Sequence, residues 1–141
     1  VEDTTDYRMD LVRLRELIAA NKDTYFQLVI PPYSKAYLTL LYRYNPKMRR
    51  EYINFLSDVH TTFQGLDNVN VILIDGDTLT EDLNNYIDMR HYIGPVIDKL
   101  VSSIRKRENF LEDDQASRIR ALSQSLENFQ ITELLNSYEV N

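Results

Sequence analysis

The stretch that decides the fold is residues 24–30, Thr-Tyr-Phe-Gln-Leu-Val-Ile, which stops at Pro31-Pro32. It is rich in aromatic and β-branched residues and almost entirely apolar, which predicts a short strand buried on both faces. Before it, apolar residues recur at the spacing of an amphipathic helix, namely Tyr7, Leu11, Leu14, Leu17 and Ile18. A helix that leads into a buried strand indicates a parallel α/β sheet.

The sequence after this strand predicts two helices and a second strand. Ser34 can cap a short helix through Tyr44, and Asn45-Pro46 supplies the N-cap and N1 proline of a longer helix that ends at Gly65. Residues 68–75 alternate between polar and apolar at first and then become fully apolar, as in a strand. Two strands joined by a helical crossover are expected to be parallel neighbours in a right-handed unit.

Two strands alone do not make a stable parallel sheet that is covered on both faces. We therefore expect this chain to be the C-terminal half of an α/β domain whose first strands lie upstream. The first residue, Val1, is not a methionine, which indicates a processed chain or a piece of a longer one. Self-association that rebuilds the missing sheet is the alternative.

The remaining sequence predicts a long loop and further helices. Residues 78–93 have no sustained period and indicate a loop with one helical turn near Glu81. Gly94-Pro95 then begins a helix. Its apolar face is expected to consist of Val96, Ile97, Leu100, Val101 and Ile104.

The C-terminal segment has a different character, with an acidic stretch followed by an apolar stripe. The stripe indicates one or two amphipathic helices, which pack on the same chain or on a partner helix. It is formed by Ile119, Leu122, Leu126, Phe129, Leu134, Leu135 and Tyr138. We therefore expect an α/β part over residues 1–107 and a helical extension over residues 108–141. Residues 1–6 are a polar end with Asp6 available as a helix cap.

Composition excludes several classes of protein. The 141 residues include three glycines and no phosphate-binding glycine motif, which argues against a bound nucleotide, and no cofactor is expected. The net charge of −6 disfavours a DNA or RNA partner. Without cysteines there is no disulfide and no thiolate nucleophile. No apolar run approaches the roughly 18 to 20 residues of a membrane span, so a membrane anchor is expected only outside this chain.

His91 is the candidate catalytic base and Asp88 is its candidate partner. Both lie in the loop after the second strand and directly before the helix that starts at Gly94. An aspartate in the pattern Asp-x-x-His can accept one ring N–H, which leaves the other ring nitrogen to act on a serine hydroxyl. The alternative interpretation is a turn aspartate and a loop histidine. The other histidine, His60, lies within a predicted helix and is interpreted as a surface or boundary residue.

Other polar residues near strand ends have simpler interpretations. Ser34 follows a strand but fits a helix N-cap better than a nucleophile. Asp75 and Asp77 lie at a strand end, where α/β proteins place functional carboxylates. A turn is nevertheless preferred for them, because two aspartates and one distant histidine are too few for a metal site. Most of the ten tyrosines are expected to be packing residues, and three lie near the proposed site: Tyr33, Tyr86 and Tyr92.

Two segments carry a resemblance to a known superfamily. The first is Ile87-Asp88-Met89-Arg90-His91-Tyr92, with Gly94 and the helix Val96-Ile97-Asp98-Lys99-Leu100-Val101 after it. It resembles the C-terminal block of the SGNH (GDSL-like) hydrolase and acyltransferase superfamily. The second is Leu28-Val29-Ile30-Pro31-Pro32-Tyr33-Ser34. It is similar to a strand-end segment of SGNH-like proteins of bacterial surface-polymer modification, such as the alginate-acetylation and D-alanyl-transfer groups.

The resemblance covers roughly residues 7–107. It implies a flavodoxin-like parallel sheet in which Asp88 and His91 complete a Ser-His-Asp triad. The family's G-D-S or G-[ST]-S block, which holds the nucleophile, and its G-x-N-D block, which helps to form the oxyanion hole, do not occur in the 141 residues. The nucleophile is therefore expected on an upstream segment, or the protein is a non-catalytic relative.

The first hypothesis for function is that the chain forms part of an SGNH-like serine esterase or O-acyltransferase of the bacterial cell envelope. It would act outside the cytoplasm on acyl groups of a surface carbohydrate or polymer, and the upstream half of the domain would supply the serine. The alternative is a non-catalytic α/β interaction module that binds a partner through its C-terminal helices. A phosphotransfer receiver using Asp75 or Asp77 ranks lower, because its acidic pair and its later lysine cannot be placed.

Overall fold

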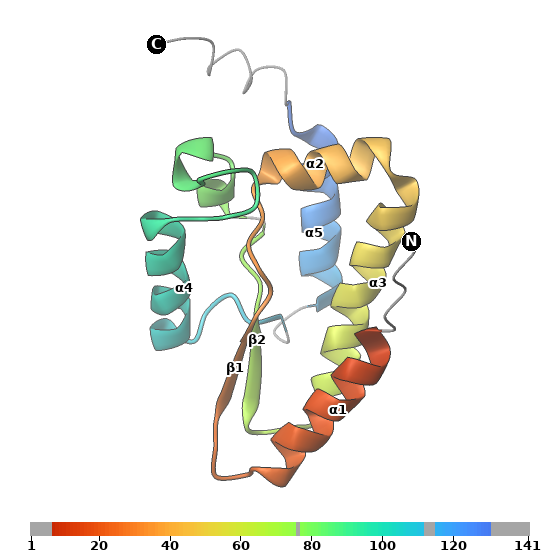
Figure 1. Ribbon diagram of the computed structural model, residues 1–141, viewed down its shortest axis with the longest axis vertical. Helices are drawn as coiled ribbons and strands as arrows, with labels where there is room; N and C mark the ends of the chain where they lie inside the picture. Colours follow the sequence, from red (N-terminus) through yellow and green to blue (C-terminus); the bar gives the residue numbers. More distant parts are fainter. Residues whose placement is uncertain (1–6, 76, 112–114, 131–141) are drawn as a thin grey trace.

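The computed structural model describes residues 7–75, 77–111 and 115–130, and these residues form a mixed α/β structure that is mostly helical (Figure 1). The prediction of helices and strands in alternation is confirmed. The elements are α1 (Tyr7–Ala20), β1 (Phe26–Val29), α2 (Lys35–Tyr44), α3 (Pro46–Phe63), β2 (Val69–Ile72), the short 3-10 helices η1 (Thr78–Thr80) and η2 (Leu83–Asn85), α4 (Gly94–Lys106) and α5 (Gln115–Asn128).

The helix boundaries follow the local capping chemistry. Ser34 Oγ accepts a hydrogen bond from the backbone N–H of Tyr37 at 3.2 Å and begins α2. Asn45 Oδ1 accepts from the backbone N–H of Met48 at 3.1 Å and begins α3, whose N1 residue is a proline. Gly65, with a φ of 80°, follows the end of α3. The caps at Ser34 and Asn45 satisfy backbone N–H groups that the first helical turn leaves free, so both predictions are confirmed. The prediction that the longer helix ends at Gly65 is also confirmed, because α3 ends at Phe63 and its C-cap is Gln64.

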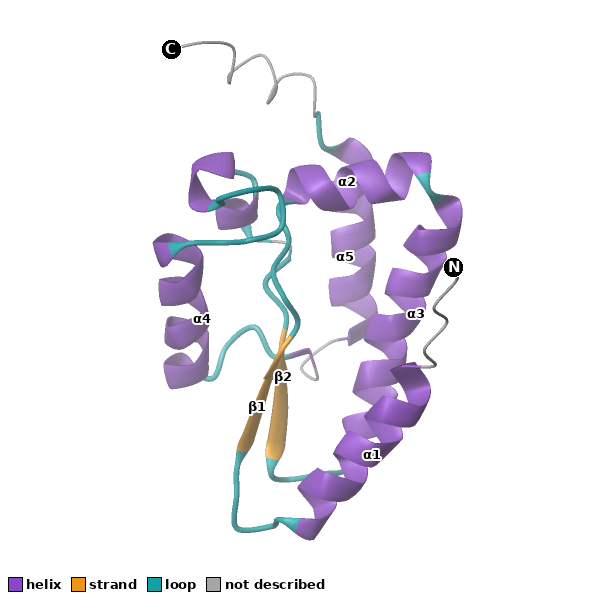
Figure 2. Cartoon of the chain, viewed as in Figure 1, coloured by secondary structure: helices purple, strands orange, loops and turns teal. Residues whose placement is uncertain are grey.

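The two strands are parallel neighbours, as predicted. Their register pairs Phe26 with Val69 and continues to Val29 with Ile72. Figure 2 shows the pair between α4 on one side and α1, α3 and α5 on the other. The strands therefore separate two hydrophobic clusters.

The two outer edges of this small sheet differ. The outer edge of β2 is covered, because Leu73 N–H donates to the Asn109 carbonyl at 3.1 Å and Ile72 forms an antiparallel bridge with Phe110. In the described part of the chain, β1 pairs with β2 alone. Val29 is 36% exposed and the rest of β1 is half-buried. The expectation that this strand is buried on both faces is wrong, because its outer edge and part of one face are uncovered.

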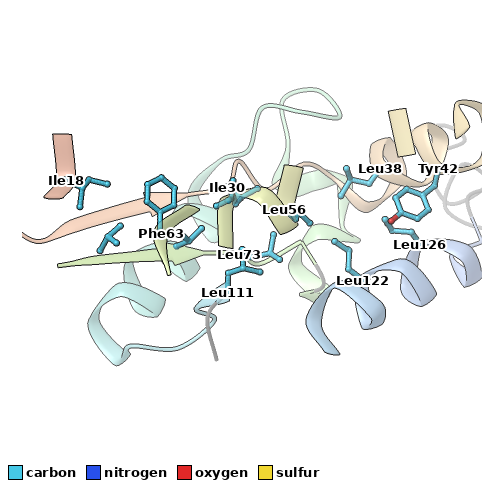
Figure 3. Close-up of a cluster of buried hydrophobic side chains, with 13 residues drawn as sticks. Ile18, Ile30, Leu38, Tyr42, Leu56, Phe63, Leu73, Leu111, Leu122 and Leu126 are labelled. Atoms are coloured by element: carbon cyan, nitrogen blue, oxygen red, sulfur yellow. The ribbon is translucent and has the colours of Figure 1, made fainter. Parts of the chain in front are cut away.

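The larger hydrophobic cluster lies on the face covered by α1, α3 and α5. Figure 3 shows it as a continuous row, from Ile18 and Phe63 at one end to Leu38, Tyr42 and Leu126 at the other. Helix α5 packs against α2 and α3, so the C-terminal stripe is used within this chain. It contributes Leu122 and Leu126, with Ile119 packed against them.

The smaller cluster joins α4 to the other face of the sheet. Val96 and Leu100 of α4 are buried against Ile72, Ile74, Tyr86 and Phe110. The other three residues of the predicted apolar face are 36% to 47% exposed: Ile97, Val101 and Ile104. None of these three side chains is buried by the described residues.

Some expectations fall on residues outside the described ranges. These are the cap at Asp6 and the end of the C-terminal stripe at Leu134, Leu135 and Tyr138. None of the helices in the described ranges combines the length and the apolar character needed to cross a membrane.

Candidate active site

Residues 86–92 form a closed loop that carries the candidate residues. Tyr86 and Tyr92 face each other in an antiparallel bridge. Inside that bridge, Ile87 N–H donates to the His91 carbonyl at 2.7 Å. The loop is therefore held by its own backbone, which fixes the positions of the side chains between its ends.

The closed loop is attached to the segment that follows β1. Ser34 N–H donates to the Met89 carbonyl at 3.1 Å, and Tyr86 O–H donates to the Pro32 carbonyl at 3.1 Å. Burial raises the pKa of Tyr86 and keeps this phenol a donor. Because Pro32 and Ser34 lie beyond the carboxyl end of β1, the loop lies at the edge of the sheet where α/β proteins place their sites.

Asp88 and His91 form the hydrogen bond that their spacing predicts. Oδ2 of Asp88 lies 2.6 Å from Nδ1 of His91. Its other oxygen, Oδ1, accepts from the backbone N–H groups of Arg90 at 2.7 Å and His91 at 2.9 Å. The bond to the His91 ring and the two backbone bonds lower the pKa of Asp88 to about 2. The catalytic role of the pair stays a prediction.

The charge on Asp88 fixes the tautomer of His91. An ionised carboxylate only accepts hydrogen bonds, so Nδ1 of a neutral His91 must carry the proton. Nε2 is then the free acceptor, and it makes no hydrogen bond with any residue in the described ranges. The side chain of His91 is 66% exposed, so Nε2 is accessible to an incoming hydroxyl group. This is the arrangement that a general base requires.

A pocket of about 410 Å³ lies beside this pair. Its lining consists of Pro31, Tyr33, Arg90, His91 and Tyr92. Tyr33 and Tyr92 were among the tyrosines expected near the site. Sequence reasoning did not select Arg90, which also lines the pocket. The available signal was its position between Asp88 and His91, because a side chain in the middle of a tight turn points away from that turn.

The other polar candidates lie elsewhere. Ser34 is completely buried and is used as the cap of α2, so it does not face His91. Asp77 caps η1 through Leu79 N–H, and its Oδ2 lies 3.1 Å from Nζ of Lys99. His60 is half-buried on α3, as predicted for a boundary residue. Within the described ranges, no group of three histidine or acidic residues could hold a metal ion.

Asp75 lies in a turn, as the sequence predicted, but its side chain is completely buried. Tyr52 O–H donates to its Oδ2, while its Oδ1 has no hydrogen-bond partner in the described structure. Burial raises its pKa to about 7, and the bond from Tyr52 opposes that rise. This pair is separate from the pocket, and no feature of the linear sequence connects the two residues.

Comparison with known proteins gives no match: no family model fits the chain, and no curated protein and no solved structure is significantly similar to it. The resemblance to the SGNH superfamily therefore stands on the residues quoted above.

Proposed function

We propose that the chain is part of an SGNH-like serine esterase or O-acyltransferase that acts on acyl groups of a bacterial surface carbohydrate or polymer, in the cell envelope outside the cytoplasm. The observation that supports the proposal is the Asp88–His91 pair, hydrogen-bonded at 2.6 Å beside a pocket at the carboxyl end of the strands. Asp88 and His91 are assigned as orienting partner and general base.

The proposed chemistry is acyl transfer through a serine. Nε2 of His91 takes the proton of the serine hydroxyl as its oxygen attacks the acyl carbonyl carbon, and the same proton is later given to the leaving oxygen. The imidazolium formed in between is stabilised by Asp88, whose low pKa keeps it ionised. The serine and the oxyanion donors are proposed to lie upstream of Val1.

A larger, flavodoxin-like sheet is part of this proposal. Two features of the described residues support it: the outer edge of β1 is unpaired, and α4 leaves Ile97, Val101 and Ile104 exposed. A further parallel strand beside β1 would pair the edge, and its attached segment would cover the exposed residues.

The alternative, a module that binds a partner through its C-terminal helices, is not favoured by α5. Leu122 and Leu126 are buried in the core of the same chain. We therefore retain the enzyme proposal.

The test uses a polypeptide that carries the sequence upstream of Val1 and measures hydrolysis of an aryl acetate. We expect His91→Ala to lower kcat/KM by about 10³-fold or more, and Asp88→Asn to lower it by a comparable or smaller factor, because triad residues act as a unit. His60→Gln is the matched control and should leave the rate unchanged. Full activity in His91→Ala would exclude the mechanism.

A second measurement identifies the nucleophile. A fluorophosphonate probe should label one serine of the longer polypeptide, and His91→Ala should slow that labelling. The 141-residue chain should not be labelled. Labelling of Ser34 would contradict the proposal, because this buried cap is assigned a structural role.

A further inference from the structure

The pocket beside His91 has two walls that come from separate segments of the chain. Pro31 and Tyr33 follow β1 and form one wall, whereas Arg90, His91 and Tyr92 belong to the closed loop and form the other. A group bound in the pocket touches both walls. The position of one wall relative to the other therefore decides where His91 lies relative to that group.

The wall that follows β1 cannot be held by donors of its own. Pro31 and Pro32 have no backbone N–H, so neither residue can donate to a neighbouring strand. Pro32 is fully buried, and a buried carbonyl requires a donor from another part of the molecule. The phenol of Tyr86 supplies this donor, at 3.1 Å from the carbonyl oxygen of Pro32.

Tyr86 is itself fixed by its surroundings. Its side chain is buried in the smaller hydrophobic cluster together with Val96 and Phe110. Its backbone N–H donates to the Leu83 carbonyl at 3.0 Å. Because both the ring and the backbone are held, the phenol O–H reaches Pro32 from a rigid base.

Two hydrogen bonds join the walls in the described part of the chain, and they differ in kind. Ser34 N–H donates to the Met89 carbonyl at 3.1 Å, so this bond connects two backbone groups in the middle of the loop. The bond from Tyr86 to Pro32 uses a side chain and lies at the base of the loop. Removal of the phenol O–H would leave the loop held to the opposite wall by the bond at its middle, about which it could turn.

We infer that Tyr86 is a positioning residue for the proposed general base: its O–H holds the loop that carries His91 at a fixed distance from the wall that follows β1. The loop is closed by backbone bonds that do not involve this phenol. The hydroxyl therefore sets where the Asp88–His91 pair lies, and not how the two residues are bonded to each other. The inference rests on the proposed function for the reaction, but the positioning itself requires no catalysis.

The first experiment measures amide hydrogen exchange, residue by residue, by NMR of the 141-residue chain. The buried Ser34 N–H reports separation of the walls, because it exchanges when its bond to Met89 opens. Tyr86→Phe keeps the buried ring and removes the hydroxyl. We expect it to speed exchange of the Ser34 N–H about tenfold, the factor that the loss of one hydrogen bond supplies. Exchange of the Ile87 N–H, which is bonded to the His91 carbonyl within the loop, should stay unchanged.

Two further variants show whether the effect belongs to this hydroxyl. Tyr42→Phe removes the hydroxyl of another buried tyrosine, which pairs with Ser123 at 3.4 Å outside the pocket lining. This matched control should leave exchange at Ser34 unchanged. Replacement of Tyr86 by 4-aminophenylalanine returns an N–H donor to the same place and should restore slow exchange. Thermal melts of all variants measure the fraction of folded chain.

The second experiment uses the polypeptide that carries the upstream sequence, with an aryl acetate as substrate. Tyr86→Phe should lower kcat about tenfold, because a base that is held less firmly reaches the reactive geometry less often. The pH midpoint of kcat/KM should remain that of the wild type, because the Asp88 carboxylate stays bonded to the His91 ring. Tyr42→Phe should keep the wild-type rate.

Three results would overturn the inference. They are an unchanged exchange rate at Ser34 in Tyr86→Phe, an equal acceleration at Ser34 and Ile87, and a wild-type rate in Tyr86→Phe where His91→Ala is inactive. Full activity in His91→Ala would instead overturn the proposed mechanism and leave the exchange result at Ser34 in place. The two proposals therefore fail in separate experiments.

Discussion

Tyr52 donates a hydrogen bond to Asp75 across the interior of the molecule, from the middle of α3 to a residue just beyond β2. The carboxyl group that accepts this bond is completely buried, and its second oxygen is unpartnered in the described structure. An ionised carboxylate in this position is unfavourable, so the arrangement couples folding to pH.

Asp75 should make the chain less stable as pH rises. Its pKa is about 7 in the folded state, against an ordinary value of 3.8, so the folded state holds the proton more tightly. The contribution of Asp75 to the free energy of unfolding is fully present below pH 3.8 and is lost as the pH rises from 3.8 to about 7. In this range the free energy of unfolding falls by at most about 1.4 kcal/mol per pH unit, and above it the fall levels off. Urea unfolding across this range measures it.

Asp75→Asn should remove that dependence and raise the free energy of unfolding at pH 8, because the amide is neutral and can still accept from Tyr52. Asp77→Asn, at the partly exposed residue paired with Lys99, is the control and should keep the slope. A wild-type chain with flat stability between pH 4 and 7 would contradict the prediction.

Asp88 should titrate at an unusually low pH. Carbon NMR of its carboxyl group should give a midpoint near pH 2, and His91→Ala should move the midpoint towards 3.8, because the His91 ring is the largest cause of the lowered pKa. The stabilising effect of the ionised group should accordingly be present at neutral pH and be lost as pH falls through about 2. A midpoint unaffected by His91→Ala would mean that the side chains are not hydrogen-bonded in solution.

Helix α5 should be required for a stable core. Leu126 is fully buried between α2 and α3, so Leu126→Ala should lower the free energy of unfolding by about 2 to 5 kcal/mol. Deletion of residues 115–141 should destabilise the chain further. Chemical unfolding measures both, and a truncated chain with an unchanged melting temperature would show that the stripe packs elsewhere.

Substitution of an exposed apolar residue of α4 should affect stability more in a longer polypeptide than in the 141-residue chain. In the 141-residue chain, Ile97→Ala should change stability by no more than about 0.5 kcal/mol, because the side chain is 47% exposed. In a polypeptide that carries the upstream sequence, the same substitution should cost about 2 kcal/mol or more, because the proposed larger sheet buries it. Equal effects in both would argue against an added sheet over α4.

Local signals predicted most of the fold. The caps at Ser34 and Asn45 and the helix at Gly94 depend on residues close together in sequence, and all are present. Asp88 and His91 also belong to this class, because the two hydrogen-bonded residues lie only three positions apart in the sequence. The parallel pairing of the strands joins distant residues, but it followed from the helical crossover between them.

Features that depend on distant residues were not predictable. Phe110 and Leu111 follow a charged segment, yet they are buried because the chain returns to the outer edge of β2. The apolar face of α4 was predicted from the helical spacing of its apolar residues. Which part of that face is covered depends on how many strands of the sheet α4 packs against. Tyr52 and Asp75 meet because α3 packs across the strands, and no spacing rule joins them.

The bridge between Tyr86 and Tyr92 closes the loop between them, so side chains within this loop can be replaced without opening it. Its internal bonds use backbone groups and the side chains of Asp88 and His91, so residues 87, 89 and 90 carry side chains that the closure does not need. A library that varies these positions, with proline left out at residues 87 and 90 to keep their N–H groups, would change the pocket rim while preserving the Asp88–His91 geometry. The loop separates selectivity from the reacting group, so the two can be engineered independently.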